Sequence, residues 1–102
     1  LARLMRETDA DAYGVVPFER MGRDHFRIRP YVAVLSAESR VFERACGSGS
    51  LALALAEGGE RGRIAVEQPG GTLFVEPGKR FFLEGEVLIS CRGTVELGNV
   101  GL

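Results

Sequence analysis

A short apolar helix constrains the fold of this chain more than any other stretch. Residues 51–56 read Leu-Ala-Leu-Ala-Leu-Ala, and both residue types are strong helix formers without β-branching. Ser48 or Ser50 can cap the start of this helix, and Gly58 can take the left-handed conformation that ends it. Because a helix without a polar face is buried on all sides, we expect the rest of the chain to wrap around it.

The turn before this helix carries a cysteine, Cys46, in the run Arg-Ala-Cys-Gly-Ser-Gly-Ser at residues 44–50. The first turn of a helix leaves backbone N–H groups unpaired and partly positive, which favours a thiolate and can hold a carboxylate. Gly47 and Gly49 have no side chains to keep a ligand from those N–H groups. The pattern alone leaves two interpretations open: a reactive cysteine beside an anion cradle, or a tight turn with a small buried cysteine.

Short β-prone stretches joined by tight turns make up most of the remaining sequence. Residues 1–8 should form the end of an amphipathic helix. We expect turns or loops at 19–24, 36–39, 58–62, 69–71, 77–79 and 92–93. We expect extended segments at 12–18, 25–35, 40–44, 63–68, 72–76, 80–84, 86–91 and 94–97. Such short strands are typical of antiparallel sheets. The sequence therefore predicts an α+β domain in which an antiparallel, barrel-like sheet curls around one central apolar helix.

Side-chain alternation gives more specific expectations about this sheet. Ile64 and Val66 should face the core, as should Leu73 and Val75. In the long segment 25–35, residues 28, 32 and 34 should face one way and residues 27, 29, 31 and 33 the other. Pro30 donates no hydrogen bond, so it should lie at an edge or a bulge.

Length and composition limit the classes of function. The 102 residues suffice for one domain with a single core, and a net charge of −1 with scattered arginines predicts neither a nucleic-acid nor a membrane partner. The longest apolar run is too short to span a bilayer, and no signal-peptide pattern is present. Two cysteines do not make a disulfide framework, so we expect a reducing, cytoplasmic setting.

Other reactive residues have simpler interpretations. His25, the only histidine, should be exposed at the start of a strand, and no acidic or histidine cluster has metal-ligand spacing, so we expect no metal. Cys91 lies in an apolar strand pattern and should be a small core residue. Lys79, the only lysine, lies in a predicted surface turn, which argues against a pyridoxal Schiff base. We therefore expect no cofactor.

The segment 40–44 leads directly into the cysteine turn and should deliver Glu43 and Arg44 to the start of the helix. A carboxylate at this place can bind a substrate ammonium group, and a guanidinium can bind a carboxylate through two parallel hydrogen bonds. The alternative interpretation is an ion pair on the surface at the end of a strand.

The run Val-Phe-Glu-Arg-Ala-Cys-Gly-Ser-Gly-Ser at residues 41–50 resembles the second-half active-site motif of the diaminopimelate epimerase superfamily, which comprises cofactor-independent amino-acid racemases and epimerases. Residues 66–76, with Pro-Gly-Gly, resemble the family's hairpin, and residues 82–87 its closing hairpin. The resemblance covers residues 31–97. It implies that residues 1–102 are one domain, the C-terminal half of an enzyme built from two pseudo-symmetric halves, each with a central helix.

The same resemblance implies roles for individual residues. In this family a thiolate removes the α-proton from one face of the substrate and a thiol returns a proton to the other. Cys46 would be one of these two cysteines, and the second would lie in the missing N-terminal half. Gly47, Ser48 and Gly49 would hold the α-carboxylate of an amino-acid substrate, and Glu43 and Arg44 would be further substrate-binding residues. A two-fold homodimer, which would bring two copies of Cys46 together, is a second possible arrangement.

The spacing of the motif bears on the substrate. Diaminopimelate epimerases carry a Gly-x-Gly-Glu-Thr segment between the Glu-Arg pair and the cysteine, whereas here Glu43-Arg44 is followed at once by Ala45-Cys46. The compact form is more similar to the histidine racemases of opine-metallophore synthesis. Histidine is therefore the expected substrate and diaminopimelate the alternative, and Glu43 can match either of two family glutamates. Proline racemases share Cys-Gly-x-Gly, but the Pro-Gly-Gly hairpin fits the epimerase branch better.

A function from a different class is a non-catalytic module that keeps the fold and uses the start of the helix only to bind an anion. A phosphate-binding loop is less consistent with the sequence, because no Gly-Lys-Ser/Thr follows the glycines. Thiol reactivity distinguishes these functions, since a catalytic cysteine reacts quickly near neutral pH and a structural one does not.

Overall fold

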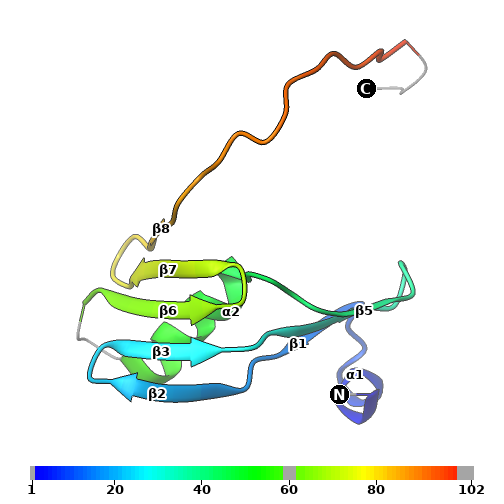
Figure 1. Ribbon diagram of the computed structural model, residues 1–102. Helices are drawn as coiled ribbons and strands as arrows, with labels where there is room; N and C mark the ends of the chain where they lie inside the picture. Colours follow the sequence, from blue (N-terminus) through cyan, green and yellow to red (C-terminus); the bar gives the residue numbers. More distant parts are fainter. Residues whose placement is uncertain (1, 59–61, 99–102) are drawn as a thin grey trace.

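The computed structural model describes residues 2–58 and 62–98, which have an α+β fold with two sheets (Figure 1). Its helices are α1 (Ala2–Thr8) and α2 (Gly47–Leu53), and α2 continues into a π-helical turn, η1 (Ala54–Gly58). The strands are β1 (Ala12–Val15), β2 (Phe18–Gly22), β3 (His25–Ile28), β4 (Tyr31–Val34), β5 (Ser39–Phe42), β6 (Ile64–Gln68), β7 (Gly71–Glu76) and β8 (Phe82–Glu84).

The two sheets are open and mostly antiparallel. The larger has the order β2-β3-β6-β7-β8, and the smaller has the order β1-β4-β5. All strand pairs are antiparallel except β3 with β6, which run parallel. The α+β class is therefore confirmed, but the described residues form no closed barrel. No helix in the described part of the chain has the length and apolar character needed to cross a membrane.

The core lies between the α2–η1 segment and one face of the larger sheet (Figure 1). In β6, Ile64 and Val66 point into this core while Ala65 and Glu67 point away. Val75 of β7 is fully buried, whereas Leu73 and Phe74 are both half-buried, so the expected alternation is clear in β6 and only partial in β7. The core is made of Phe26, Ile28, Leu53, Ala54, Ile64, Val66 and Val75.

The apolar helix is not buried on all sides, contrary to the expectation from its sequence. Leu53 and Ala54 lie in the core, whereas Leu55 is 60% exposed and Ala52 is also exposed. The reason is geometric: the helix packs against one sheet face, and the described residues place no second layer over its other side. The central position expected for this helix is therefore not established by the fold.

Pro30 divides the long extended segment 25–35 into β3 and β4, which belong to different sheets. Pro30 has no N–H to continue a ladder, and its carbonyl accepts a hydrogen bond from Glu43 N at 2.8 Å. The side-chain alternation restarts after this break, so Ala33 is buried while Val32 and Val34 are only half-buried. Residues 32 and 34 thus lie opposite residue 33 as expected, but the alternation does not run on from Ile28, because β3 and β4 belong to different sheets.

The turn predicted at residues 19–24 is shorter than expected. The strand β2 continues through Gly22, and only Arg23 and Asp24 form the turn into β3. The pairing of β2 with β3 shifts register between Arg20 and Gly22. Such a bulge lets the hairpin accommodate an extra residue without ending the strand.

After β8 the chain leaves the sheet as an extended segment, residues 85–98, which we term the C-terminal arm (Figure 1). The strands expected at 86–91 and 94–97 are absent, and Cys91, expected in the core, is exposed. A β-prone segment becomes a strand only where another strand pairs with it, and no strand of the described residues pairs with this arm. Five apolar side chains of the arm are at least 54% exposed: Val87, Leu88, Ile89, Val95 and Leu97.

Candidate functional site

Cys46 is the residue that caps the start of α2. Its backbone is extended (φ −139°, ψ 108°), and Ser50 N donates to its carbonyl oxygen at 3.0 Å, which begins the helix. Its Sγ accepts a hydrogen bond from Gly49 N at 3.3 Å. The sulfur thus takes the place that a serine or aspartate oxygen usually has in a helix cap. The caps expected from the sequence, Ser48 and Ser50, are not used.

A buried glutamine, Gln68, holds Cys46 from the end of β6. Its Oε1 accepts from Cys46 N at 2.6 Å, and its Nε2 donates to Ser50 Oγ at 2.8 Å. Ser50 Oγ in turn donates to the Cys46 carbonyl oxygen at 2.7 Å. Gln68 is 6% exposed and Ser50 is fully buried. The buried side chains of Gln68 and Ser50 therefore have hydrogen-bond partners, and together they fix both peptide groups of Cys46.

The turn between β6 and β7 holds the segment before Cys46. Gly70 N donates to the Arg44 carbonyl oxygen at 2.7 Å, and Arg44 Nη2 donates to the Pro69 carbonyl oxygen at 3.4 Å. A Cβ on Gly70 would lie 2.9 Å from the Arg44 oxygen, so this close approach requires glycine. The Pro-Gly-Gly turn thereby contacts the cysteine motif directly.

A hollow of about 320 Å³, which we term the Cys46 hollow, opens beside the thiol. Cys46, Ser48 and Gly49 line it, and Ser48 Oγ lies 3.5 Å from Cys46 Sγ. A Cβ on Gly49 would lie 3.1 Å from this sulfur, so the sulfur has little free space on the side that faces the helix. None of the lining residues is charged; they are Ala12, Tyr13, Gly14, Val16, Val32, Cys46, Ser48, Gly49 and Ala52.

The remaining candidate residues lie outside this lining. The strand expected to reach residue 44 ends at Phe42, and Glu43 is half-buried, with its backbone N–H bonded to Pro30. Arg44 is exposed and bonded to Pro69. Gly47 is half-buried near β8, where an added Cβ would lie 2.9 Å from a methyl of Leu83. The structure therefore gathers Cys46, Ser48 and Gly49 at one hollow and places Glu43, Arg44 and Gly47 around its outside.

Sequence reasoning missed two residues of this site, Gln68 and Tyr13. Gln68 follows Ile64 and Val66 at the next inward position of one strand, and a polar residue at such a position was the available signal. Tyr13 on β1 is half-buried in the wall of the hollow. No feature of the local sequence distinguishes it from other tyrosines of β-strands.

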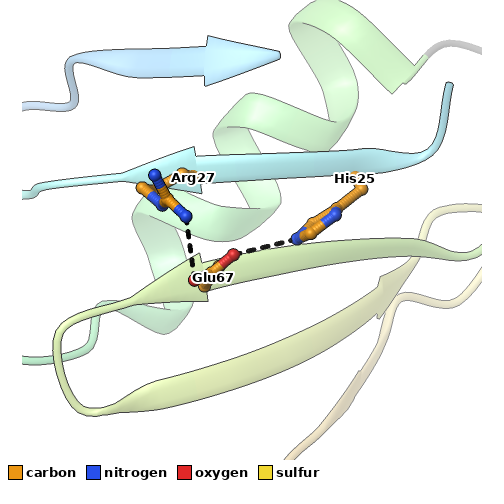
Figure 2. Close-up of polar contacts among 3 residues, drawn as sticks. All are labelled: His25, Arg27 and Glu67. Atoms are coloured by element: carbon orange, nitrogen blue, oxygen red, sulfur yellow. Dashed lines mark hydrogen bonds and ion pairs between the residues drawn. The ribbon is translucent and has the colours of Figure 1, made fainter. Parts of the chain in front are cut away.

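His25 lies away from this site, on the sheet face opposite α2, where Figure 2 shows it with Arg27 and Glu67. Its Nε2 is 3.0 Å from Glu67 Oε2, and Arg27 Nη2 is 3.3 Å from Glu67 Oε1. All three side chains are more than a third exposed, and such surface pairs contribute at most about 1 kcal/mol. The prediction of an exposed histidine at a strand start is confirmed. Residues 2–58 and 62–98 contain no group of three metal-binding side chains.

No family model matches the chain, but the chain is similar to proteins named histidine racemase. Two such relatives come from two strains of Fusobacterium nucleatum subsp. nucleatum. One is 30% identical over 96 residues, covering 91% of this chain and 35% of the racemase. The other is 27% identical over 99 residues, covering 94% and 36%. The chain thus spans about a third of the length of these relatives.

Proposed function

We propose that this chain is the C-terminal half of a cofactor-independent amino-acid racemase or epimerase in which Cys46 is one of two acid/base groups. The observation that carries the proposal is the cysteine at the start of α2, with its sulfur beside a hollow and bonded to Gly49 N. Similarity to histidine racemases over nearly the whole chain supports the same class.

Racemisation needs a base that removes the α-proton on one face of the carbon and an acid that returns a proton on the other. In the proposed reaction the Cys46 thiolate removes the proton from the face that it contacts, or its thiol donates one there. The developing negative charge is stabilised by backbone N–H groups at the helix start. Because Gly49 N already donates to the sulfur, the N–H group of Ser48, which lines the hollow, is assigned to the carboxylate.

The second acid/base group has to come from outside the described part of this chain. Cys91 lies on the C-terminal arm and does not line the Cys46 hollow. We assign the second group to a cysteine of an N-terminal half that docks against this one. A homodimer that juxtaposes two copies of Cys46 is the alternative, but one lining would then have to fit both ends of an asymmetric amino acid.

We assign histidine as the substrate, with diaminopimelate as the alternative. The uncharged lining of the Cys46 hollow supports this choice. Diaminopimelate would bring a second ammonium and a second carboxylate to the site, and burying charges against uncharged walls is costly. An imidazole is largely neutral at physiological pH and presents an aromatic ring that apolar walls and Tyr13 can contact.

The test is Cys46→Ser in the complete enzyme that carries this chain, with Cys91→Ser as the matched control. Cys46→Ser should lower α-proton exchange in heavy water by about 10²-fold or more, because a serine hydroxyl is too weak an acid to supply the base. Cys91→Ser should retain the parent rate. The parent enzyme should exchange L-histidine faster than LL-diaminopimelate.

Each outcome of this test has a separate meaning. Comparable exchange in Cys46→Ser would remove Cys46 from the chemistry. A strong preference for diaminopimelate would overturn the substrate but leave the mechanism in place. Absence of exchange with every amino acid, together with saturable binding of an anion, would favour the non-catalytic module.

A further inference from the structure

Gln68 is a buried residue of β6 whose side chain makes two hydrogen bonds to the cysteine motif. It follows Ile64 and Val66 on the buried side of β6, where core strands usually carry an apolar side chain. Instead, its amide oxygen and amide nitrogen each have one partner, Cys46 N and Ser50 Oγ. The role of this polar group therefore has to be sought in Cys46 and Ser50, the two residues that it binds.

These contacts form a closed ring around Cys46. The glutamine binds the peptide N–H on one side of the Cys46 Cα, and through Ser50 it reaches the carbonyl on the other side. A backbone tied at both peptide groups keeps its extended conformation, and this conformation sets the direction of the Cα–Cβ bond. The direction of this bond decides whether Sγ meets Gly49 N and faces the Cys46 hollow.

We infer that Gln68 is a positioning residue that, together with Ser50, holds the Cys46 thiol at the start of α2 and directed at the Cys46 hollow. This inference rests on the proposed function for its meaning in catalysis. It concerns the reactivity of the thiol, however, and that can be measured without turnover.

The measurement is the pH profile of Cys46 alkylation by iodoacetamide in the 102-residue chain. All variants carry Cys91→Ser, because the exposed Cys91 thiol would otherwise react too. Gln68→Glu keeps the size and the acceptor but cannot donate to Ser50, and it adds a negative charge beside Cys46 N. We expect its profile to shift by about one unit to higher pH, since a like charge opposes the thiolate.

Two further variants remove the ring without adding charge. Gln68→Leu loses both hydrogen bonds, and Ser50→Ala loses the link to the Cys46 carbonyl. Both should slow alkylation at neutral pH by about threefold or more, because the contact between the sulfur and Gly49 N loosens. If Gln68→Leu does not fold, Ser50→Ala still decides the question, because it removes the ring without adding charge.

The matched control is Glu67→Gln, at the neighbouring position of β6. Glu67 points to the opposite face, toward His25 and Arg27, so its profile should equal that of the parent. In the complete enzyme, Gln68→Glu should lower kcat and leave KM nearly unchanged.

A purely structural role for Gln68 makes a different prediction. The uncharged variants Gln68→Leu and Ser50→Ala would then melt at lower temperature but keep the parent alkylation profile, and this result would overturn the inference. Failure of the proposed function is recognised separately, by racemisation that persists in Cys46→Ser. In that case slower alkylation of Gln68→Leu and Ser50→Ala would still assign Gln68 to the positioning of a thiol.

Discussion

At the residue scale, the site depends on a sulfur that caps a helix. Sequence reasoning could place Cys46 at the start of α2, because the helix formers after it and the glycines beside it are local signals. It could not assign Gln68, which lies 22 residues away and reaches Cys46 only through the fold of β6. The Cys46 hollow could not be predicted either, because its other wall comes from β1 and β4. Local chemistry was therefore predictable, and the partners brought by tertiary structure were not.

Tyr13 offers a residue-scale prediction about specificity. Tyr13→Ala in the complete enzyme should raise KM for histidine about five- to tenfold with a smaller change in kcat, because an aromatic contact contributes about 1 kcal/mol. Steady-state racemisation followed by circular dichroism gives both constants. Tyr13→Phe is the control, and it should resemble the parent if the ring rather than the hydroxyl contacts the substrate. Unchanged kinetics in Tyr13→Ala would show that this wall of the hollow does not touch the substrate.

At the scale of helices and strands, the sequence patterns that predicted the structure correctly were those within one strand or one turn. Alternation in β6 and the Pro-Gly-Gly turn predicted the β6–β7 hairpin, with Ile64 and Val66 inward. Pairings between distant segments were not predictable. The parallel pair of β3 with β6 joins segments on either side of α2, and the break at Pro30 sends β3 and β4 to different sheets. Local propensity specifies an extended conformation but not the partner strand.

The contact between the hairpin turn and the cysteine motif yields an element-scale prediction. Gly70→Ala should destabilise the domain by about 1–3 kcal/mol, because the new methyl group would meet the Arg44 carbonyl at 2.9 Å. The displaced turn should also slow alkylation of Cys46. Urea denaturation measures the first effect. Gly93→Ala is the control, since nothing lies within 4 Å of a Cβ at that position, and it should match the parent. Equal stability of the two variants would show that the turn adjusts without cost.

At the scale of the whole molecule, the C-terminal arm is the main departure from a self-contained domain. Its residues have the apolar character of strands, yet Val87 is 86% exposed and Leu88 is 80% exposed. Apolar surface of this kind usually marks an interaction site. The relatives extend over nearly three times the length that this chain covers. We therefore propose that the arm pairs as β-structure with the N-terminal half of the enzyme.

Hydrogen exchange tests this proposal, because a paired strand protects its amides and a solvated arm does not. In the 102-residue chain, amides of residues 86–97 should exchange rapidly while those of β6 are protected. Adding the separately expressed N-terminal half should slow exchange in the arm by about tenfold or more and leave β6 unchanged. A chain truncated after Gly85 should bind that half more weakly than the intact chain, whereas Val87→Ile, which keeps the apolar character, should bind normally.

The same preparations decide whether two different halves are required. The chain alone should fold yet show no deuterium exchange into histidine, because one helix start reaches only one face of the α-carbon. Exchange should appear when the N-terminal half is added. If the arm becomes protected in the chain alone as its concentration rises, and exchange into histidine rises with it, then a homodimer provides both faces and the proposal of two halves is wrong. Protection without exchange would instead describe self-association through exposed apolar surface, with the second acid/base group still to be supplied by another half.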